Sequence, residues 1–283
     1  MKQALREELG AALGAAVAAV RPLSGGDIND AWRVELSDGR AVFVKTRERA
    51  DAEMFLRESE GLAWLAEARA LRVPEVLAVG GSFLALELIE PGRRAPGFDE
   101  RLGRGLAALH RYGAEGFGWR EDNFIGSLPQ DNTREPDWPT FYVRRRLEPQ
   151  LRRATQRGLA SDAMQKSFAR LFTRMGSLVG PPEPPARLHG DLWGGNFHVD
   201  EDGAPVPIDP AVYGGHREMD LAMMQLFGGF SDRVFAAYDE AWPLADGWRE
   251  RTPLYQLYPL MVHVNLFGGG YVASVERILR ALV

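Results

Sequence analysis

Two carboxylates and one amide stand close together in the stretch LHGDLWGGNFHVDEDGAPVPIDP. They are Asp191, which follows a His-Gly pair, Asn196 five residues later, and Asp209 near the end of the stretch. Phosphoryl transfer needs a carboxylate that accepts the proton of the attacking hydroxyl, and an amide and a second carboxylate that hold Mg²⁺ against the phosphates. Kinases separate that base and that amide by four residues on one loop. The spacing therefore indicates a base at Asp191 and metal ligands at Asn196 and Asp209.

The residues between Asn196 and Asp209 predict a short hairpin. Residues 197–199 and 206–208 favour strands, and the run Asp200-Glu201-Asp202-Gly203 favours a turn between them. The alternative is that these Asp and Asn side chains only cap turns, where both types are common. That alternative leaves the agreement of three positions in order and spacing unexplained.

A cation for the phosphates is predicted at the end of a strand. Of the 34 basic residues, 31 are arginine, and the lysines are Lys2, Lys45 and Lys166. Lys45 ends the run AVFVK, which is similar to the V-A-I-K strand of protein kinases. A compact ammonium group fits between two phosphates where a broad guanidinium does not. The alternative is a surface lysine at a strand end, which is less expected in a chain with so few lysines.

The partner of this lysine is predicted from helical geometry. At 100° per residue, Phe55, Leu62 and Leu65 share one face of a helix, and Glu58 lies between Leu62 and Leu65 in angle. A lone carboxylate on a buried face is costly unless it is paired. We therefore expect Glu58 to pair with Lys45; the alternative is that Glu58 lies at the edge of the apolar face and reaches water.

Two backbone segments are further candidates for nucleotide contacts. The loop of residues 23–29 is rich in small residues, which let backbone N–H groups approach phosphates, although it lacks the full G-x-G-x-x-G pattern. The end of the last predicted sheet strand falls where a kinase hinge offers backbone groups to adenine. The candidates are Gly25, Gly26, Ile28 and Asn29 in the loop and Glu87, Leu88 and Ile89 at the hinge.

The pattern of apolar residues predicts an α+β fold of two lobes. In residues 1–90 we expect a mainly antiparallel sheet: helices at 5–20 and 54–69, and strands at 32–36, 41–45, 76–79 and 83–89. The run PGRRAPG, residues 91–97, is a plausible linker. In residues 91–283 we expect helices at 99–112, 139–157, 161–179, 219–227, 231–242 and, in one or more pieces, 254–282. The smaller lobe would bind nucleotide, and the larger one would carry the catalytic loop and the substrate site.

Composition excludes several classes of protein. The chain has 283 residues, a formal net charge of −5 and no cysteine. The charge argues against a general nucleic-acid binder, and the lack of cysteine excludes disulfides, thiolate metal sites and a cysteine nucleophile. The apolar segment 9–20 follows Glu7 and Glu8, which do not suit a signal peptide, and it is too short to span a membrane. We expect a cytoplasmic protein that binds neither nucleic acid nor membrane.

Longer strings resemble one known family. The H-G-D-x-x-x-x-N loop, with Gly in place of the protein-kinase Arg, is similar to that of the aminoglycoside phosphotransferase and choline kinase superfamily. LHGDLWGGN, IDPAVYGGHREMDLAM, LFGGF, IGSLPQDNTREPDWPTFYVRRRLEPQL and ELIEPG resemble the fructosamine kinases, also called ketosamine-3-kinases. The similarity runs over nearly the whole chain, and it implies a two-lobed protein-kinase-like fold.

The resemblance also implies roles for the residues already singled out. Asp191 would be the catalytic base, Asn196 and Asp209 would bind Mg²⁺, and Lys45 paired with Glu58 would hold the phosphates of ATP.

Five other residues receive roles by the same resemblance. Trp193 would lie beside the sugar-amine substrate, and Asp220 would brace the catalytic loop; the other interpretation is a helix N-terminal cap, and the two roles are compatible. His189 would brace the same loop, and Tyr213 and Glu218 are substrate contacts or plain loop residues, evenly weighed.

One residue departs from the family. Some members carry a cysteine in the glycine-rich loop, where this chain has Asp27, so thiol control at that place is excluded. An acidic residue so close to phosphates is unexpected, and we expect it to point away or to bind a loop amide.

The sequence therefore predicts an ATP- and Mg²⁺-dependent kinase that phosphorylates a sugar hydroxyl, by resemblance O3, of a ketoamine. The product would be unstable and would lose its sugar, which would make the role deglycation. One alternative is a kinase of the same fold that acts on an aminoglycoside, choline or a free sugar; another is a nucleotide-binding pseudoenzyme. The ketoamine could be free or protein-linked, and the oligomeric state is open, with a monomer possible.

Overall fold

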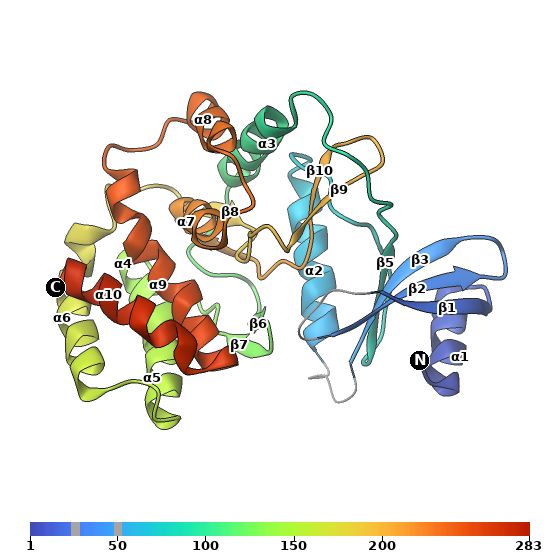
Figure 1. Cartoon of the computed structure of the whole chain (residues 1–283), viewed down its shortest axis with the longest axis horizontal. Coiled ribbons are helices and arrows are strands. Elements are labelled where there is room, and N and C mark those ends of the chain that lie inside the picture. The colour runs from blue at the N-terminus through green and yellow to red at the C-terminus, as the bar shows by residue number, and fades with distance from the viewer. Residues whose placement is uncertain (24–28, 48–52) are drawn as a thin grey trace.

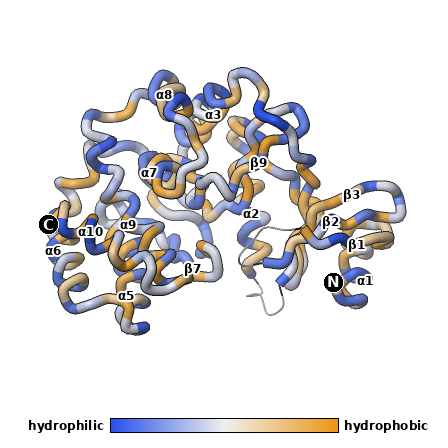
Figure 2. The backbone as a smooth tube through the Cα atoms, viewed as in Figure 1, coloured by the Kyte–Doolittle hydropathy of each residue, from blue (hydrophilic) through white to orange (hydrophobic). Residues whose placement is uncertain are grey.

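The computed structural model describes residues 1–23, 29–47 and 53–283. Figure 1 shows two lobes side by side along the long axis, with the N-terminus in the sheet lobe and the C-terminus in the helical lobe. The predicted α+β, two-lobed fold is confirmed. Apolar and hydrophilic stretches alternate along both lobes (Figure 2), and no helix of the described residues is long and apolar enough to cross a membrane.

The smaller lobe is one antiparallel sheet of five strands in the order β1-β2-β3-β5-β4. Alternate residues of β3 and β5 face opposite sides, because side chains alternate across a strand. Helix α1 covers one face over Val42, Val44 and Phe83, and helix α2 covers the other over Leu84 and Leu86. The elements are α1 (Gln3–Leu13), β1 (Val17–Leu23), β2 (Asp30–Leu36), β3 (Ala41–Thr46), α2 (Met54–Glu67), β4 (Val76–Val79) and β5 (Phe83–Glu87).

The first helix is shorter than the predicted one, which extended to Val20. Gly14 has φ +72°, a left-handed conformation that ends a helix readily at glycine. The β-branched residues Val17 and Val20 then lie in β1, which pairs with β2 at the edge of the sheet. The prediction was wrong there because sheet pairing outweighed the helical propensity of the alanines.

The larger lobe packs ten helical segments of the described residues around one large core. The predicted helix at 139–157 is present without a break, and its middle turn is a π-helix. The last predicted helix, expected in one or more pieces, begins earlier and consists of two helices joined by a 3₁₀ turn. The segments are α3 (Phe98–Tyr112), α4 (Trp138–Phe141), the π-helix η1 (Tyr142–Leu147), α5 (Glu148–Gln156), α6 (Asp162–Leu178), α7 (Glu218–Phe227), α8 (Asp232–Ala241), α9 (Trp248–Phe267), the 3₁₀ turn η2 (Gly269–Tyr271) and α10 (Val272–Leu282).

Three pairs of short strands connect these helices to the site. The expected hairpin is present, and its register brings the residue before β9 opposite the residue after β10. Two other pairs were not predicted, since three-residue strands carry too little pattern to be recognised. The pairs are β9 (Phe197–Val199) with β10 (Pro205–Pro207), β8 (Ala186–Leu188) with β11 (Tyr213–Gly215), and β6 (Asn123–Ile125) with β7 (Leu128–Gln130).

The two lobes touch where the linker meets the β9–β10 hairpin. The amide of Gly92 donates to the carbonyl of Val199 over 2.9 Å. A Cβ at Gly92 would lie 1.9 Å from the carbonyl oxygen of Asp200, so only glycine permits this approach. Arg72 of the smaller lobe binds Asp200 over 2.6 Å. A division at residue 90 stays a prediction; it is supported by the five-stranded sheet, which ends at Glu87.

Candidate active site

Lys45 joins three elements that lie far apart in the sequence. It stands near the end of β3 on the face covered by α2, and it is 5% exposed. Its ammonium group donates to Glu58 of α2 over 2.5 Å and also to Asp209, which follows β10. The predicted Lys45–Glu58 pair is therefore formed, and the same cation reaches across to the larger lobe.

Burial and charge act in opposite directions on this cluster. Burial alone would lower the pKa of Lys45, but the carboxylates of Asp209 and Glu58 outweigh it and raise that pKa. The pKa of Glu58 is raised, because burial and the charge of Asp209 together outweigh the attraction of Lys45. The ammonium group thus stays charged, as a phosphate-binding group must.

The catalytic loop places Asp191 beside Asn196. The amide nitrogen of Asn196 donates both to the carbonyl of Asp191 and to its carboxylate, each over 2.9 Å. Desolvation raises the pKa of Asp191 to about 7; the charges of Asp209 and Asp220 act in the same direction and the Asn196 hydrogen bond opposes them. A carboxyl group with a pKa near the working pH suits a general base.

Asp220 of α7 fixes the catalytic loop through hydrogen bonds to its backbone. Its carboxylate accepts from the amides of His189 over 2.8 Å and Gly190 over 2.9 Å, and it lies 3.1 Å from the ring of His110. The predicted brace is therefore present. Helix α7 begins at Glu218, and the residue before it forms no side-chain cap, so the capping alternative is not supported.

The space between His189 and Asp191 admits only glycine at position 190. Gly190 has φ +84°, and a Cβ there would lie 2.0 Å from the carbonyl oxygen of Ala211. The amide of Ala211 donates to the carbonyl of His189 over 2.9 Å, and the ring of His189 bonds the carbonyl of Ile208 over 3.0 Å. His189 thus braces the loop, as predicted, and the loop lies directly against the segment that carries Asp209.

Asn196 and Asp209 together fit a magnesium ion. The amide of Ile208 donates to the carbonyl of Asn196 over 3.0 Å, which brings the two ligand candidates next to each other. Asp209 has φ +56°, an uncommon conformation for a residue with a side chain and one that clusters at functional sites. Among the described residues, the amide oxygen of Asn196 and the second carboxylate oxygen of Asp209 have no hydrogen-bond partner. Oxygen ligands of this kind are the ones that Mg²⁺ prefers.

The glycine-rich loop lies mostly outside the described residues. The candidates Gly25, Gly26 and Ile28, and also Asp27, belong to the part that the structure does not describe. Asn29, at the end of that loop, has a buried side-chain oxygen without a partner among the described residues. An unpaired buried acceptor is costly, so this oxygen is suited to a donor from a ligand.

The predicted hinge divides into two parts. Among the described residues, the backbone groups of Leu88 and Ile89 form no hydrogen bond, so they are available to hydrogen-bond the adenine ring of a nucleotide. Glu87 differs: its amide donates to Glu75, and its carboxylate binds Arg72 over 2.5 Å. Its side chain belongs to the contact between the lobes, and its role as an adenine contact stays a prediction, as do those of Leu88 and Ile89.

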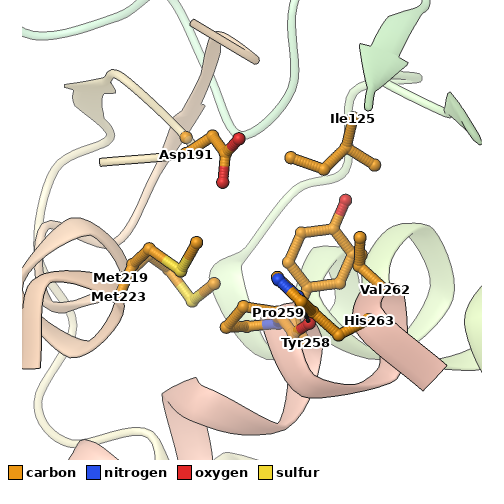
Figure 3. A pocket seen from close by; sticks show the side chains of 9 residues that line it. Ile125, Asp191, Met219, Met223, Tyr258, Pro259, Val262 and His263 are labelled. Atoms are coloured by element: carbon orange, nitrogen blue, oxygen red, sulfur yellow. Dashed lines mark hydrogen bonds between the residues drawn. The ribbon is translucent and has the colours of Figure 1, made fainter. Parts of the chain in front are cut away.

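A pocket opens directly in front of Asp191 (Figure 3). Apolar side chains from α7 and α9 form its floor, and the carboxylate of Asp191 faces them across it. The wall combines apolar side chains with the polar groups of Asp191, Tyr258 and His263, a composition that small-molecule sites share. It is lined by Ile125, Gly190, Asp191, Met219, Met223, Tyr258, Pro259, Val262 and His263.

Trp193 stands at the rim of the catalytic loop. Its side chain is exposed for its size, at 36%, and its ring meets Phe227 edge-on at 6.0 Å. A Cβ at Gly195 would lie 2.2 Å from the indole, so the ring can fold over the loop only because that residue is glycine. The position agrees with a substrate contact, which stays a prediction.

Tyr213 and Glu218 do not reach the pocket wall. Tyr213 is fully buried beneath Gly190, with the guanidinium of Arg146 3.9 Å from its ring centre. Glu218 is 2% exposed and pairs with Arg251 through two hydrogen bonds of 2.6 and 3.0 Å. Their burial does not support the predicted substrate contacts; of the two weighed alternatives, the structural role fits both.

Several buried polar residues near the site were not predicted. Asn123 donates to the carbonyl of Val212 over 2.8 Å, and Gln130 donates to that of Ala211 over 3.1 Å and accepts from the hydroxyl of Tyr258 over 2.6 Å. They fix the segment that follows Asp209 and connect it to the pocket wall. The only signal in the sequence was the polar residues within the string NFIGSLPQDN, residues 123–132, whose partners lie about 80 residues or more away along the chain.

Three features meet between the sheet lobe and the helical lobe. They are the Lys45–Glu58 ion pair, the carboxylate of Asp191 with its raised pKa, and the oxygens of Asn196 and Asp209 that have no partner among the described residues. This is the arrangement of two-lobed phosphotransferases, and the class of the protein is thereby an ATP-dependent kinase. The fructosamine kinase family model matches residues 1–283. The chain therefore belongs to the fructosamine kinase family.

Individual relatives agree with this assignment. A protein of Enterococcus faecium described as a probable ketoamine kinase is 40% identical over 265 residues, which cover 92% of this chain and 94% of that protein. The chloroplastic protein-ribulosamine 3-kinase of Oryza sativa subsp. indica is 39% identical over 271 residues, 93% of this chain and 78% of that protein.

Solved structures extend the comparison to the fold. A crystal structure assigned to a fructosamine-3-kinase of Thermobifida fusca has a TM-score of 0.92 at 42% identity, and covers 100% of this chain and 99% of that one. A macrolide 2′-phosphotransferase has a TM-score of 0.64 at 16% identity, with 100% of this chain and 98% of that one covered, which shows the shared fold alone.

Proposed function

We propose that the protein transfers the γ-phosphoryl group of ATP to a sugar hydroxyl of a ketoamine, with O3 as the acceptor oxygen. The observation that carries this proposal is the pocket in front of Asp191, whose loop packs against the segment that carries Asp209, the partner of Lys45. Family membership supports the ketoamine as acceptor, and the plant relative is named for ribulosamine on a protein. Loss of the sugar from the phosphorylated product would make the reaction a deglycation.

Each residue then has a limited task. Asp191 accepts the proton as the acceptor oxygen forms a bond to the γ-phosphorus, and the bond from that phosphorus to the bridging oxygen breaks to release ADP. Lys45, held by Glu58, binds phosphate oxygens. Asn196 and Asp209 would hold Mg²⁺, which when bound neutralises charge on the transferring group.

The first test measures ADP release with a panel of acceptors. We expect turnover with fructosamine or ribulosamine attached to lysine, and little with an aminoglycoside, choline or free sugar. If the protein turns over an aminoglycoside, choline or a free sugar but neither ketoamine, the proposed acceptor is wrong and the assignment as a kinase is retained.

The second test separates a kinase from a nucleotide-binding pseudoenzyme. Asp191→Asn keeps the shape of the side chain but removes the base, so kcat should fall about a thousandfold while ATP affinity is retained. A wild type that binds ATP and turns over no acceptor would favour the pseudoenzyme.

A further inference from the structure

Five rings form a continuous strip that leads from the pocket to solvent. Their centres lie 6.0 Å apart for Trp193 and Phe227, 4.5 Å for Phe227 and His263, and 5.4 and 5.0 Å for His263 with Phe267 and Tyr271. His263 also lines the pocket in front of Asp191 (Figure 3). We call this strip the aromatic rim; its members are Trp193, Phe227, His263, Phe267 and Tyr271.

Two glycine turns build the rim. The turn after α9 begins at Gly268, with φ +90°, and folds back so that Tyr271 meets the same ring as Phe267. A Cβ at any glycine from 268 to 270 would meet nothing within 4 Å, so open space adjoins the outer end of the rim. At the other end, Gly194 packs within contact of Gly229, which sets Trp193 against Phe227.

His263 offers an acceptor within this strip. Its Nδ1 lies 2.8 Å from the carbonyl oxygen of Pro259, and since a carbonyl can only accept, Nδ1 carries a proton. Burial lowers the pKa of His263, so the ring is neutral at pH 7 and its Nε2 is an acceptor.

The rim is also free of protein cations. Guanidinium groups stand over aromatic rings at ten places among the described residues, yet over none of the rim rings. In a chain with 31 arginines, this leaves ring faces available to a cation from outside. The nitrogen of a ketoamine is a secondary ammonium group, and it lies one carbon from the sugar carbonyl.

We propose that the aromatic rim binds the amine side of the ketoamine and favours a long, unbranched stem, such as a lysine side chain, whose far end emerges beside Gly268–Gly270. This inference rests on the proposed function and names its amine class. The stem packs along Phe267 and Tyr271, while the ammonium group meets ring faces and the acceptor of His263. A short amine with its own carboxylate cannot reach the outer rings.

The experiment compares kinetics on fructosamine attached to Nα-acetyl-lysine and to glycine. Phe267→Ala should raise KM for the lysine compound about fivefold, leave kcat and KM for ATP unchanged, and alter the glycine compound less than twofold. Tyr112→Ala is the matched control, because Tyr112 is similarly exposed, 56% against 52%, and lies away from the rim. Equal KM values for Phe267→Ala and wild type on the lysine compound would overturn the proposal.

A second variant identifies where the lysine comes from. Gly269→Leu adds bulk at an open position, and Gly176→Leu, also open, is its control on α6. If the stem belongs to a protein, Gly269→Leu should lower kcat/KM about tenfold for glycated lysozyme and spare the free lysine compound. If wild type turns over only the free compound, the source is a metabolite and the rim still stands.

Failure of the proposed function would be visible separately. If wild type turns over no ketoamine, binding of the lysine compound is measured by calorimetry without nucleotide, and this measurement tests the aromatic rim independently of the reaction. Weaker binding by Phe267→Ala than by Tyr112→Ala would support the rim, and equal binding or none would remove it.

Discussion

At the level of single residues, Asp191 is set apart by a pKa close to the working pH. The pocket desolvates its carboxylate, and the nearby carboxylates of Asp209 and Asp220 disfavour a further negative charge. The hydrogen bond from Asn196 acts against this but does not cancel it. In the proposed role of general base, a carboxyl group with a pKa near 7 combines basicity with a substantial ionised fraction at neutral pH.

A pH profile tests this property. Because Asp191 must be deprotonated, kcat/KM should fall about tenfold per pH unit below a midpoint near 7 and level off above it. The pKa of His189 is lowered by burial, so that ring does not account for a midpoint near 7. A profile that stays level from pH 5 to 8 would contradict the assignment.

Lys45 is the second residue whose removal is informative. Lys45→Met keeps the stem but leaves Glu58 buried without its cation, which should cost about 3 kcal/mol of unfolding free energy and nearly all activity. The double variant Lys45→Met with Glu58→Gln removes the unpaired charge. Denaturant unfolding should show recovered stability for the double variant, while its activity stays lost; recovered activity would separate Lys45 from phosphate binding.

At the level of elements, α7 and the catalytic loop act as one unit. The backbone amides of His189 and Gly190 both donate to the carboxylate of Asp220 in α7. The position of Asp191, the next residue, therefore depends on where that helix lies. The same helix contributes Met219 and Met223 to the pocket floor. A shift of α7 would therefore move base and floor together.

Asp220→Asn tests this coupling. An amide has only one accepting oxygen, so one of the two loop amides loses its partner. We expect kcat to fall about tenfold or more, with ATP affinity unchanged because the nucleotide candidates lie on the other lobe. Asp239→Asn is the control, since that exposed carboxylate also accepts from a backbone amide, of Leu244. Equal kcat in both variants would remove the positioning role.

Elements were predicted best where a local pattern also reflects the tertiary fold. The helical face of α2 was enough to place Glu58, and the hairpin of β9 and β10 was evident from its acidic turn. The end of α1 was missed although Gly14 marked it. The contacts of His110, Asn123 and Gln130 could not be predicted, because their partners are set by helix packing and not by spacing in the chain.

At the scale of the whole molecule, buried histidines connect stability to pH. His216 lies 2% exposed against the ring of Tyr255, and burial lowers its pKa to about 4. The unfolded chain binds this proton near pH 6.5. Stability from the neutral ring is therefore present above pH 6.5 and is lost as the pH falls toward 4, by about 3 kcal/mol at most.

His216→Gln should make unfolding less sensitive to acid. The difference in unfolding free energy between pH 7.5 and pH 5 should be smaller in the variant than in wild type, even if the variant is less stable at both. Denaturant titrations at the two pH values give this difference. An unchanged difference would assign the acid sensitivity to other groups.

The burial of Lys45 also bears on how its amine can react with sugars. An amine condenses with a sugar only as an accessible free base, and this amine is enclosed by two carboxylates that keep it protonated. The other lysines, Lys2 and Lys166, are exposed on the surface. The amine that we propose to bind phosphate is thus shielded from the adduct chemistry that forms ketoamines.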